Sequence, residues 1–250
     1  MKINNKILLE EYNNKGWIKI KNLITKKDID KINYRIDKFL KRKLKNYSGR
    51  DINFSIDKNQ TQKNINSFHK LADSNLIKKN LAKRNNITKI ANYFLKTKSK
   101  FMASELFAKP AKYGLAAPIH QDNYYWCVKN SNALTIWIAL NKVSKLNGGV
   151  FYYEKSHLAG LLKHIPSFAK GSSQKIADKN ILKKFKKRFP NLSPGDALIH
   201  HCLTVHGSGK NNSNISRRGV TLQFRAKNSI IDKILKKNYE KQLKHQIKSR

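Results

Sequence analysis

The sequence predicts an α+β fold in which a helical N-terminal layer packs on an all-β core of the sandwich or barrel type. Before residue 100, apolar residues recur at the spacing of amphipathic helices. After residue 100, short apolar or alternating runs follow one another, separated by turn formers such as Asn147–Gly148–Gly149. The length of 250 residues suits one β-rich domain. We therefore expect a single domain over 1–250, with its β-core at about 100–227.

The N-terminal part is predicted to begin with a strand and a long helix. Residues 16–23 alternate apolar and polar side chains, which is the period of a half-buried strand. Thr25 is a suitable N-cap, and Asp28 follows at the capping-box position. The apolar spacing beyond it predicts an amphipathic helix over 26–44, with an inner face made of Ile29, Ile32, Ile36 and Leu40.

The rest of the helical layer, which spans about 25–97, is less regular. Residues 47–66 are polar and aperiodic, so we expect a long loop there. Two further helices are predicted over 69–83 and 88–97, the second opened by Thr88. We expect these helices to support the sheet.

The β-core is predicted from five runs with strand-like patterns, at 101–108, 133–143, 149–154, 196–200 and 218–226. A lysine-rich insertion over 158–192 is expected to be partly helical. The tail, at about 229–248, has the pattern of a basic amphipathic helix.

The charge balance is the most unusual global property of the chain. Fifty-three Lys and Arg residues stand against 15 Asp and Glu residues, a formal net charge of +38. Such a field attracts nucleic acids, anionic membranes and acidic metabolites. Only nine of the 53 are arginine, however, and the lysines are spread along the whole chain. This favours a compositional bias over a nucleic-acid-binding element. We expect a small-molecule substrate, for which an anionic character is compatible with the charge.

The remaining global features favour a reducing cytoplasm. Cys127 and Cys202 form no C-x-x-C pair and indicate no disulfide framework. The first 17 residues have no sustained apolar core, so we expect no secretory signal. No run approaches the roughly 18 apolar residues of a membrane helix. Nothing in the sequence indicates the oligomeric state.

Three residues predict a metal site. His120 and Asp122 lie two apart in an extended segment, so both side chains point to one side. His206 follows the turn former at 193–196 and the apolar run at 197–200. Two imidazoles and one carboxylate on one side of Fe(II) leave open positions opposite, as in oxygen-activating non-haem iron enzymes. The H-x-D pattern alone favours a surface hydrogen-bonded pair; the later histidine and the strand arginine shift the interpretation to a metal site.

A cosubstrate pocket is predicted beside this metal site. Arg217 lies eleven residues beyond His206, at the start of an alternating strand. A buried guanidinium there can bind the distal carboxylate of 2-oxoglutarate through two parallel hydrogen bonds. Ser208 can add a hydroxyl to the same carboxylate. Thr135 and Trp137 share one face of a strand and are expected to wall the pocket.

Two of these assignments have alternatives. Arg218 competes with Arg217, because neighbouring strand residues face opposite ways and a shift by one exchanges them. His200 and His201 could replace His206 as a ligand. The Gly-Ser-Gly context and the spacing to arginine favour His206, so we assign the other two to packing or to hydrogen bonds behind the metal.

The strand before the metal site offers a possible substrate wall. Glu105, Phe107 and Lys109 share one face of it. Either all three line a substrate cavity, or Phe107 belongs to the core and Lys109 is solvated. The sequence leaves both interpretations open.

Five segments together resemble the phytanoyl-CoA dioxygenase family: HQDNYYW, ALTIWIALNKVSKLNGG, EKSH, PGDALIHHCLTVHGSGKN and RRGVTLQF. The resemblance runs from about residue 10 to 227 and is strongest in 118–157 and 194–224. It implies a double-stranded β-helix (jelly roll) that uses Fe(II), 2-oxoglutarate and O₂. One departure is Glu154-Lys155, where many relatives have Pro-Gly.

Position by position, the resemblance implies that the metal ligands are His120, Asp122 and His206. It implies that Arg217 anchors 2-oxoglutarate. It implies further cosubstrate contacts at Thr135, Trp137 and Ser208. Asp122 stands where related halogenases have Gly or Ala. The resemblance therefore implies hydroxylation of an unactivated C–H bond, with succinate and CO₂ as coproducts. The rival hypothesis is a non-enzymatic basic protein that binds nucleic acid or an anionic surface, and it predicts salt-dependent DNA retention.

Overall fold

Two antiparallel sheets form the core of the computed structural model, which describes residues 5–49, 51–55, 61–75, 77 and 81–248. The larger sheet has seven strands, in the order β1 (Trp17–Ile20), β11 (Ala197–His201), β6 (Ala133–Ala139), β13 (Arg217–Ala226), β4 (Ser99–Lys109), β3 (Ile65–Phe68) and β2 (Ile52–Phe54). The smaller sheet has four, in the order β10 (Lys187–Arg188), β7 (Val150–Tyr153), β12 (His206–Ser208) and β5 (Ala117–His120). Apolar side chains of β6 and β7, including Trp137 and Tyr152, meet between the sheets. The expected jelly roll is confirmed.

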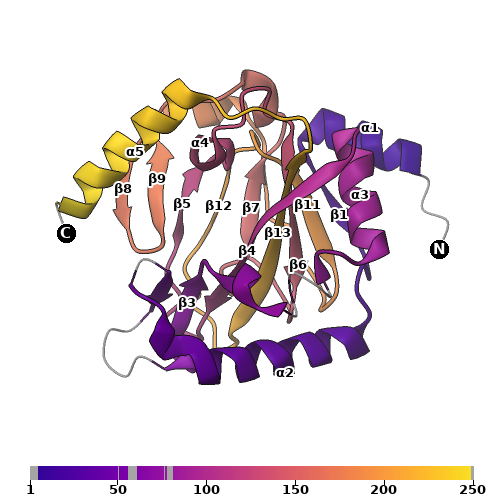
Figure 1. Cartoon of the computed structure of the whole chain (residues 1–250), viewed down its shortest axis with the longest axis vertical. Helices are drawn as coiled ribbons and strands as arrows, with labels where there is room; N and C mark the ends of the chain where they lie inside the picture. Colours follow the sequence, from indigo (N-terminus) through magenta and orange to yellow (C-terminus); the bar gives the residue numbers. More distant parts are fainter. Residues whose placement is uncertain (1–4, 50, 56–60, 76, 78–80, 249–250) are drawn as a thin grey trace.

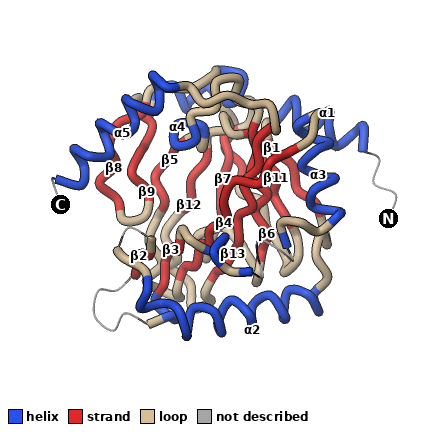
Figure 2. Tube along the Cα trace, viewed as in Figure 1, coloured by secondary structure: helices blue, strands red, loops and turns tan. Residues whose placement is uncertain are grey.

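Helices cover the periphery of this sandwich (Figures 1 and 2). They are α1 (Asn5–Lys15), α2 (Lys26–Lys43), α3 (Asn85–Leu95), α4 (Asn123–Trp126) and α5 (Lys233–Lys248). In Figure 1, α2 runs along the bottom of the molecule, and α3 packs on β4, β6 and β13. At the upper left, α5 lies beside α4 and the hairpin of β8 (His164–Ala169) and β9 (Ser172–Ile176).

The helix α2 forms as the apolar spacing predicts. The Thr25 hydroxyl accepts a hydrogen bond from the backbone N–H of Asp28 at 3.2 Å, so the predicted N-cap is present. Basic residues fill the last turn, where they oppose the partial negative charge of the helix C-terminus. The face that α2 buries is the predicted one, made of Ile29, Ile32, Ile36 and Leu40.

The main apolar core lies between the helices and the outer face of the larger sheet. It joins Ile36 of α2 to Ile136 of β6 and Leu222 of β13. Because side chains alternate across a strand, the residues beside these, such as Thr135 and Thr221, point to the inner face between the two sheets. Polar side chains of the larger sheet can therefore gather there without disturbing the core.

The prediction of a loop over 47–66 is wrong, because this segment contains β2 and the start of β3. These strands join the sheet through β4, where Ser67 pairs with Phe107 and Phe68 with Leu106. All four residues of β3 are buried, so the strand has no exposed face that would produce an alternating pattern. Pairing distant in the sequence, rather than local periodicity, makes this segment a strand.

Two helix predictions also differ from the structure. The helix expected over 69–83 begins as a 3-10 turn at Leu71–Asp73, and residues 75, 77 and 81 are helical, while residues 76 and 78–80 lie outside the described part of the chain. The helix expected over 88–97 begins at Asn85. Thr88 does not open it, since its hydroxyl donates to the Ala82 carbonyl at 3.3 Å.

The insertion over 158–192 is mainly extended. It contains the β8–β9 hairpin, a 3-10 turn at Asn180–Lys184 and strand β10. Before it, Lys155 has φ +64°, a conformation that glycine adopts more readily, at the point where this sequence lacks the Pro-Gly of many relatives. The five predicted core strands and the C-terminal helix are present. Within the described residues, no helix is long and apolar enough to cross a bilayer.

Candidate metal and cosubstrate site

Two neighbouring strands of the smaller sheet bring the three predicted metal ligands together. His206 of β12 pairs directly with His120 of β5, so both imidazoles lie on one face. Asp122 follows β5 at the start of α4. Its Oδ1 lies 3.6 Å from Nε2 of each histidine, and the donor atoms of all three residues lie within 4.8 Å of one another. The convergence required for a shared metal ion is therefore present.

Hydrogen bonds orient both imidazoles for metal binding. Nδ1 of His120 lies 2.8 Å from the Pro118 carbonyl, and Nδ1 of His206 lies 2.9 Å from the Thr204 carbonyl. A carbonyl can only accept, so each Nδ1 carries the proton and each Nε2 keeps its lone pair. Burial lowers the pKa of His206 to about 3, which keeps this ring neutral. Both Nε2 atoms are thus prepared as ligands.

The Asp122 carboxylate is held by its other oxygen. Oδ2 accepts a hydrogen bond from the Thr135 hydroxyl at 2.7 Å and another from Nε2 of His200 at 3.0 Å. Nδ1 of His200 in turn accepts from the Tyr152 hydroxyl at 2.9 Å. Burial alone would raise the pKa of Asp122, but the hydrogen bond from His200 helps to hold this pKa well below its usual range. Oδ1 therefore remains as an ionised ligand atom.

This donor set fits Fe(II). Two neutral imidazoles and one carboxylate oxygen converge from one side, which is the arrangement of the 2-His-1-carboxylate iron enzymes. Partners behind the ligands, such as Thr135 and His200, hold them in place. The sequence predicts Thr135 in the wall of the cosubstrate pocket. The structure shows it lining the cavity and also bonded to Asp122.

Beside the metal site lie two buried cations, Arg217 and Lys109. Arg217 is 1% exposed and donates hydrogen bonds to the carbonyls of Gly148 and Phe107. Nζ of Lys109 donates to the Ser208 hydroxyl at 2.7 Å and to the Gly209 carbonyl. Burial, together with the charge of Arg217, lowers the pKa of Lys109 well below its usual value.

Neither cation forms an ion pair with a carboxylate of the described residues. Buried charges are expensive unless they are paired. A dianionic keto acid that binds the metal at one end can supply the missing negative charge at the other. The donor chemistry of this pocket therefore fits 2-oxoglutarate.

The register of β13 separates the two candidate arginines. Arg217 faces the cavity, with its guanidinium carbon 5.4 Å from the centroid of the Trp137 ring. Arg218 faces the other way and pairs with Asp37 of α2 at 2.9 Å. Space for the Trp137 indole exists because Gly219 has no side chain; a Cβ there would overlap the ring. The structure thus places Trp137, Arg217 and Ser208 around one pocket.

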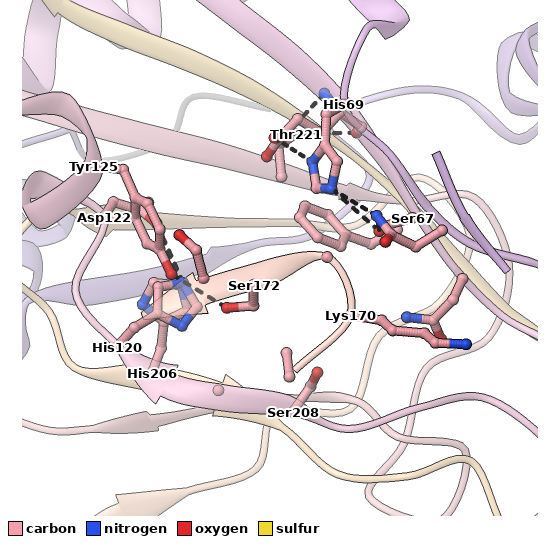
Figure 3. Close-up of a pocket in the computed structure, with 18 of the residues that line it drawn as sticks. Ser67, His69, His120, Asp122, Tyr125, Lys170, Ser172, His206, Ser208 and Thr221 are labelled. Carbon is pink, nitrogen blue, oxygen red and sulfur yellow. Dashed lines mark hydrogen bonds and ion pairs between the residues drawn. The ribbon is translucent and has the colours of Figure 1, made fainter. Parts of the chain in front are cut away.

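One cavity of about 530 Å³ contains the whole site (Figure 3). It is lined by the three metal ligands, by Arg217 and Lys109, and by a further group of polar residues. Glu105, Phe107 and Lys109 all line it. That this cavity binds the substrate stays a prediction. Sequence reasoning missed other lining residues: Asn53, Ser67 and His69 from the segment predicted as loop and helix, Gln223 of β13, and Tyr239 and Leu243 of α5. Only the pairing of β3 with β4 brings the first of these groups to the site.

Comparisons with known proteins agree with this site. The model of the family described as phytanoyl-CoA dioxygenase (PhyH) matches residues 12–219. Peroxisomal phytanoyl-CoA dioxygenase of Homo sapiens is 25% identical over 236 residues, covering 88% of this chain and 69% of its own. A probable alpha-ketoglutarate-dependent hypophosphite dioxygenase of Stutzerimonas stutzeri is 27% identical over 150 residues, covering 58% of this chain and 52% of its own.

Solved structures show the same fold. EctD from S. alaskensis, with 2-oxoglutarate and 5-hydroxyectoine, is similar at a TM-score of 0.73 and 17% identity, covering 90% of this chain and 77% of that one. The epimerase SnoN from nogalamycin biosynthesis is similar at 0.70 and 17%, covering 92% and 88%. The family match extends over most of the sequence and includes all three residues that converge between the sheets. The chain therefore belongs to the phytanoyl-CoA dioxygenase family and is a non-haem iron dioxygenase that uses 2-oxoglutarate.

Proposed function

We propose that the protein hydroxylates an unactivated C–H bond of a small molecule. In this reaction 2-oxoglutarate and O₂ are consumed, one oxygen atom enters succinate, the other enters the new hydroxyl group, and CO₂ is released. The observation that carries the proposal is the convergence of His120, Asp122 and His206 beside the buried side chains of Arg217 and Lys109. Neither basic side chain pairs with a carboxylate in the part of the chain that the structure describes. Because Asp122 supplies a carboxylate, the position that a halide would need is taken, which favours hydroxylation over halogenation.

Each residue has a distinct role in this proposal. His120, Asp122 and His206 hold Fe(II), which together with the cosubstrate supplies the oxidising chemistry. Arg217 binds the distal carboxylate of 2-oxoglutarate, helped by the hydroxyl of Ser208. Trp137 walls the cosubstrate pocket and, with the sheet around it, keeps water from the anion. Thr135 lines the same cavity and holds Asp122 in position.

The anionic substrate that the composition allows gains no support from the two buried basic side chains beside the metal site, because both are assigned here to the cosubstrate. A reducing compartment, which we take to be the cytoplasm, is supported by the free and buried state of Cys127 and Cys202. The rival nucleic-acid-binding function is not favoured by any feature of the cavity.

Succinate formation tests the proposal directly. Purified protein should form succinate only with both Fe(II) and 2-oxoglutarate present, in a reaction slow without substrate. Asp122→Ala should abolish it, whereas Asp37→Ala, which removes an exposed carboxylate on α2, should not. Iron-loaded protein that forms no succinate with a broad substrate panel would contradict the proposal. DNA retention that decreases with salt and is unaffected by Asp122→Ala would support the rival instead.

A further inference from the structure

One wall of the cavity is polar and is assigned to neither the metal nor the cosubstrate. This polar wall consists of Glu105 of β4, at its centre, and of His69, Ser67 and Gln223. One carboxylate oxygen lies 2.7 Å from Nδ1 of His69, and the other accepts a hydrogen bond from the Gln223 amide at 2.9 Å. The second nitrogen of His69 lies 3.3 Å from the hydroxyl of Ser67. In Figure 3, His69 and Ser67 lie at the opposite end of the cavity from His120 and His206.

The sheet register places this wall within reach of a substrate. Gln223 of β13 pairs with Thr135 of β6, the residue bonded to Asp122. Glu105 lies on β4, two strands from β6, which is about 10 Å at the usual strand spacing. Arg217 lies four residues from Thr221, the cross-strand partner of Glu105, or roughly 13 Å along β13. The wall and the cosubstrate pocket therefore lie in different directions from the metal site.

The wall has strong hydrogen-bonding capacity. Burial alone would lower the pKa of His69, but the Glu105 carboxylate, which lies 2.7 Å from Nδ1 of His69, raises that pKa above the usual value and so favours the protonated ring. A carboxylate has about four lone-pair positions. His69 and Gln223 use two of those of Glu105, whose side chain is 22% exposed to the cavity and solvent. The remaining positions accept hydrogen bonds, and hydroxyl groups supply them without adding charge.

Two tyrosine rings line another part of the cavity, and Tyr125 lies against the metal ligand His120. Tyr125 and Tyr239 contact each other with ring centroids 5.7 Å apart, and Leu243 of α5 lies beside them in the lining. The hydroxyl of Tyr125 contacts Ser172 in the β8–β9 hairpin at 3.2 Å. At the tip of this hairpin, Gly171 approaches so closely that a Cβ would lie 2.5 Å from the Ser67 hydroxyl. The hairpin and α5 thus limit the size of the cavity.

We propose that the substrate is a neutral, hydroxyl-rich small molecule of the sugar, cyclitol or nucleoside type, whose hydroxyl groups bind Glu105 and Gln223 while its ring packs against Tyr125 and Tyr239. The inference rests on the proposed hydroxylase function and names its substrate class. An acyl chain is the wrong occupant for this wall. It would remove water from the Glu105 carboxylate and return no hydrogen bond, which is costly for a charged group.

The test uses iron-loaded protein with 2-oxoglutarate and measures succinate formed with each of four probes: D-glucose, myo-inositol, adenosine and octanoyl-CoA. At least one of the three hydroxyl-rich probes should stimulate succinate formation several-fold over the rate without substrate. Glu105→Gln should raise the KM for that probe about tenfold or more, the usual effect of losing a hydrogen bond to a charged group. The same variant should bind 2-oxoglutarate with an unchanged Kd, because the cosubstrate pocket is separate.

The matched control is Glu11→Gln, which alters an exposed carboxylate paired with Lys15 on α1 and should change neither constant. Stimulation by octanoyl-CoA alone, or by none of the four probes, would overturn the substrate class. An unchanged KM in Glu105→Gln would overturn the role of the wall. Failure of the wild-type protein to bind 2-oxoglutarate at all would instead count against the proposed function, so the two failures are distinguishable.

Discussion

Replacement of Arg217 by Met should specifically weaken 2-oxoglutarate binding. The guanidinium is buried with no carboxylate partner among the described residues, so a bound anion gains a charge-assisted contact in a water-poor setting. Hydrogen bonds to charged groups contribute about 1.5–3 kcal/mol each. Lys109 remains nearby and offsets part of the loss. We expect about 3 kcal/mol, or roughly a hundredfold increase in Kd.

Arg218→Met is the matched control for this experiment. Arg218 is the next residue of the same strand, but it pairs with the half-exposed Asp37 at 2.9 Å. Such surface pairs contribute about 0–1 kcal/mol. Anaerobic calorimetric titration of each iron-loaded variant with 2-oxoglutarate gives the Kd, and circular dichroism verifies that both are folded. The reasoning is refuted if Arg217→Met binds within threefold of wild type, or if Arg218→Met loses as much.

Three further changes test other parts of the structure. His200→Phe removes a hydrogen-bond donor to Asp122 and should reduce Fe(II) affinity about 10- to 100-fold. Tyr152→Phe removes the hydroxyl that bonds His200, one hydrogen bond further from the metal, and should have a smaller effect. Equal losses of Fe(II) affinity in the two variants would argue against this order. Gly219→Ala forces a methyl group into the Trp137 ring and should cost about 2 kcal/mol of unfolding free energy, which an unchanged denaturation midpoint would disprove. Burial lowers the pKa of His164 to about 4 in the folded protein. As the pH falls from about 6.5 to 4, the His164 imidazole therefore takes up a proton in the unfolded chain but not in the folded one. The free energy of unfolding should decrease by on the order of 2–3 kcal/mol over this range. His164→Gln should flatten that part of the pH–stability curve, and an identical slope would count against the assignment.

Features that depend on local periodicity could be predicted from the sequence. The helix α2 follows from the spacing of its four buried residues and from the Thr25 cap. His120 and Asp122 were predicted to share a side because alternate residues of an extended segment do so. The two side chains do converge, but Asp122 has helical backbone angles, φ −59° and ψ −36°, at the start of α4, so the turn after β5 and not strand alternation directs it. The same rule predicted that only one of Arg217 and Arg218 can face the cavity. Which one does so depends on the register of β13 against β4 and β6.

Features that depend on distant pairing could not be predicted. β3 joins the larger sheet through its pairing with β4, about forty residues later, so His69 and Ser67 had no visible connection to the site in the sequence. The link from Tyr152 through His200 to Asp122 joins three separate segments. The double role of Thr135 is of the same kind, because its hydroxyl on the larger sheet reaches Asp122, which follows β5 of the smaller sheet, only when the two sheets pack together.

Anaerobic titration with Fe(II) in the presence of 2-oxoglutarate is the most direct test of the metal site. Chelation of Fe(II) by a keto acid gives a visible charge-transfer absorption band, which reports metal and cosubstrate at one place. We predict that the band saturates at one Fe(II) per chain, is lost in His206→Ala and persists in His201→Gln. Saturation unaffected by His206→Ala, or loss of the band in His201→Gln alone, would contradict a site built on His120, Asp122 and His206.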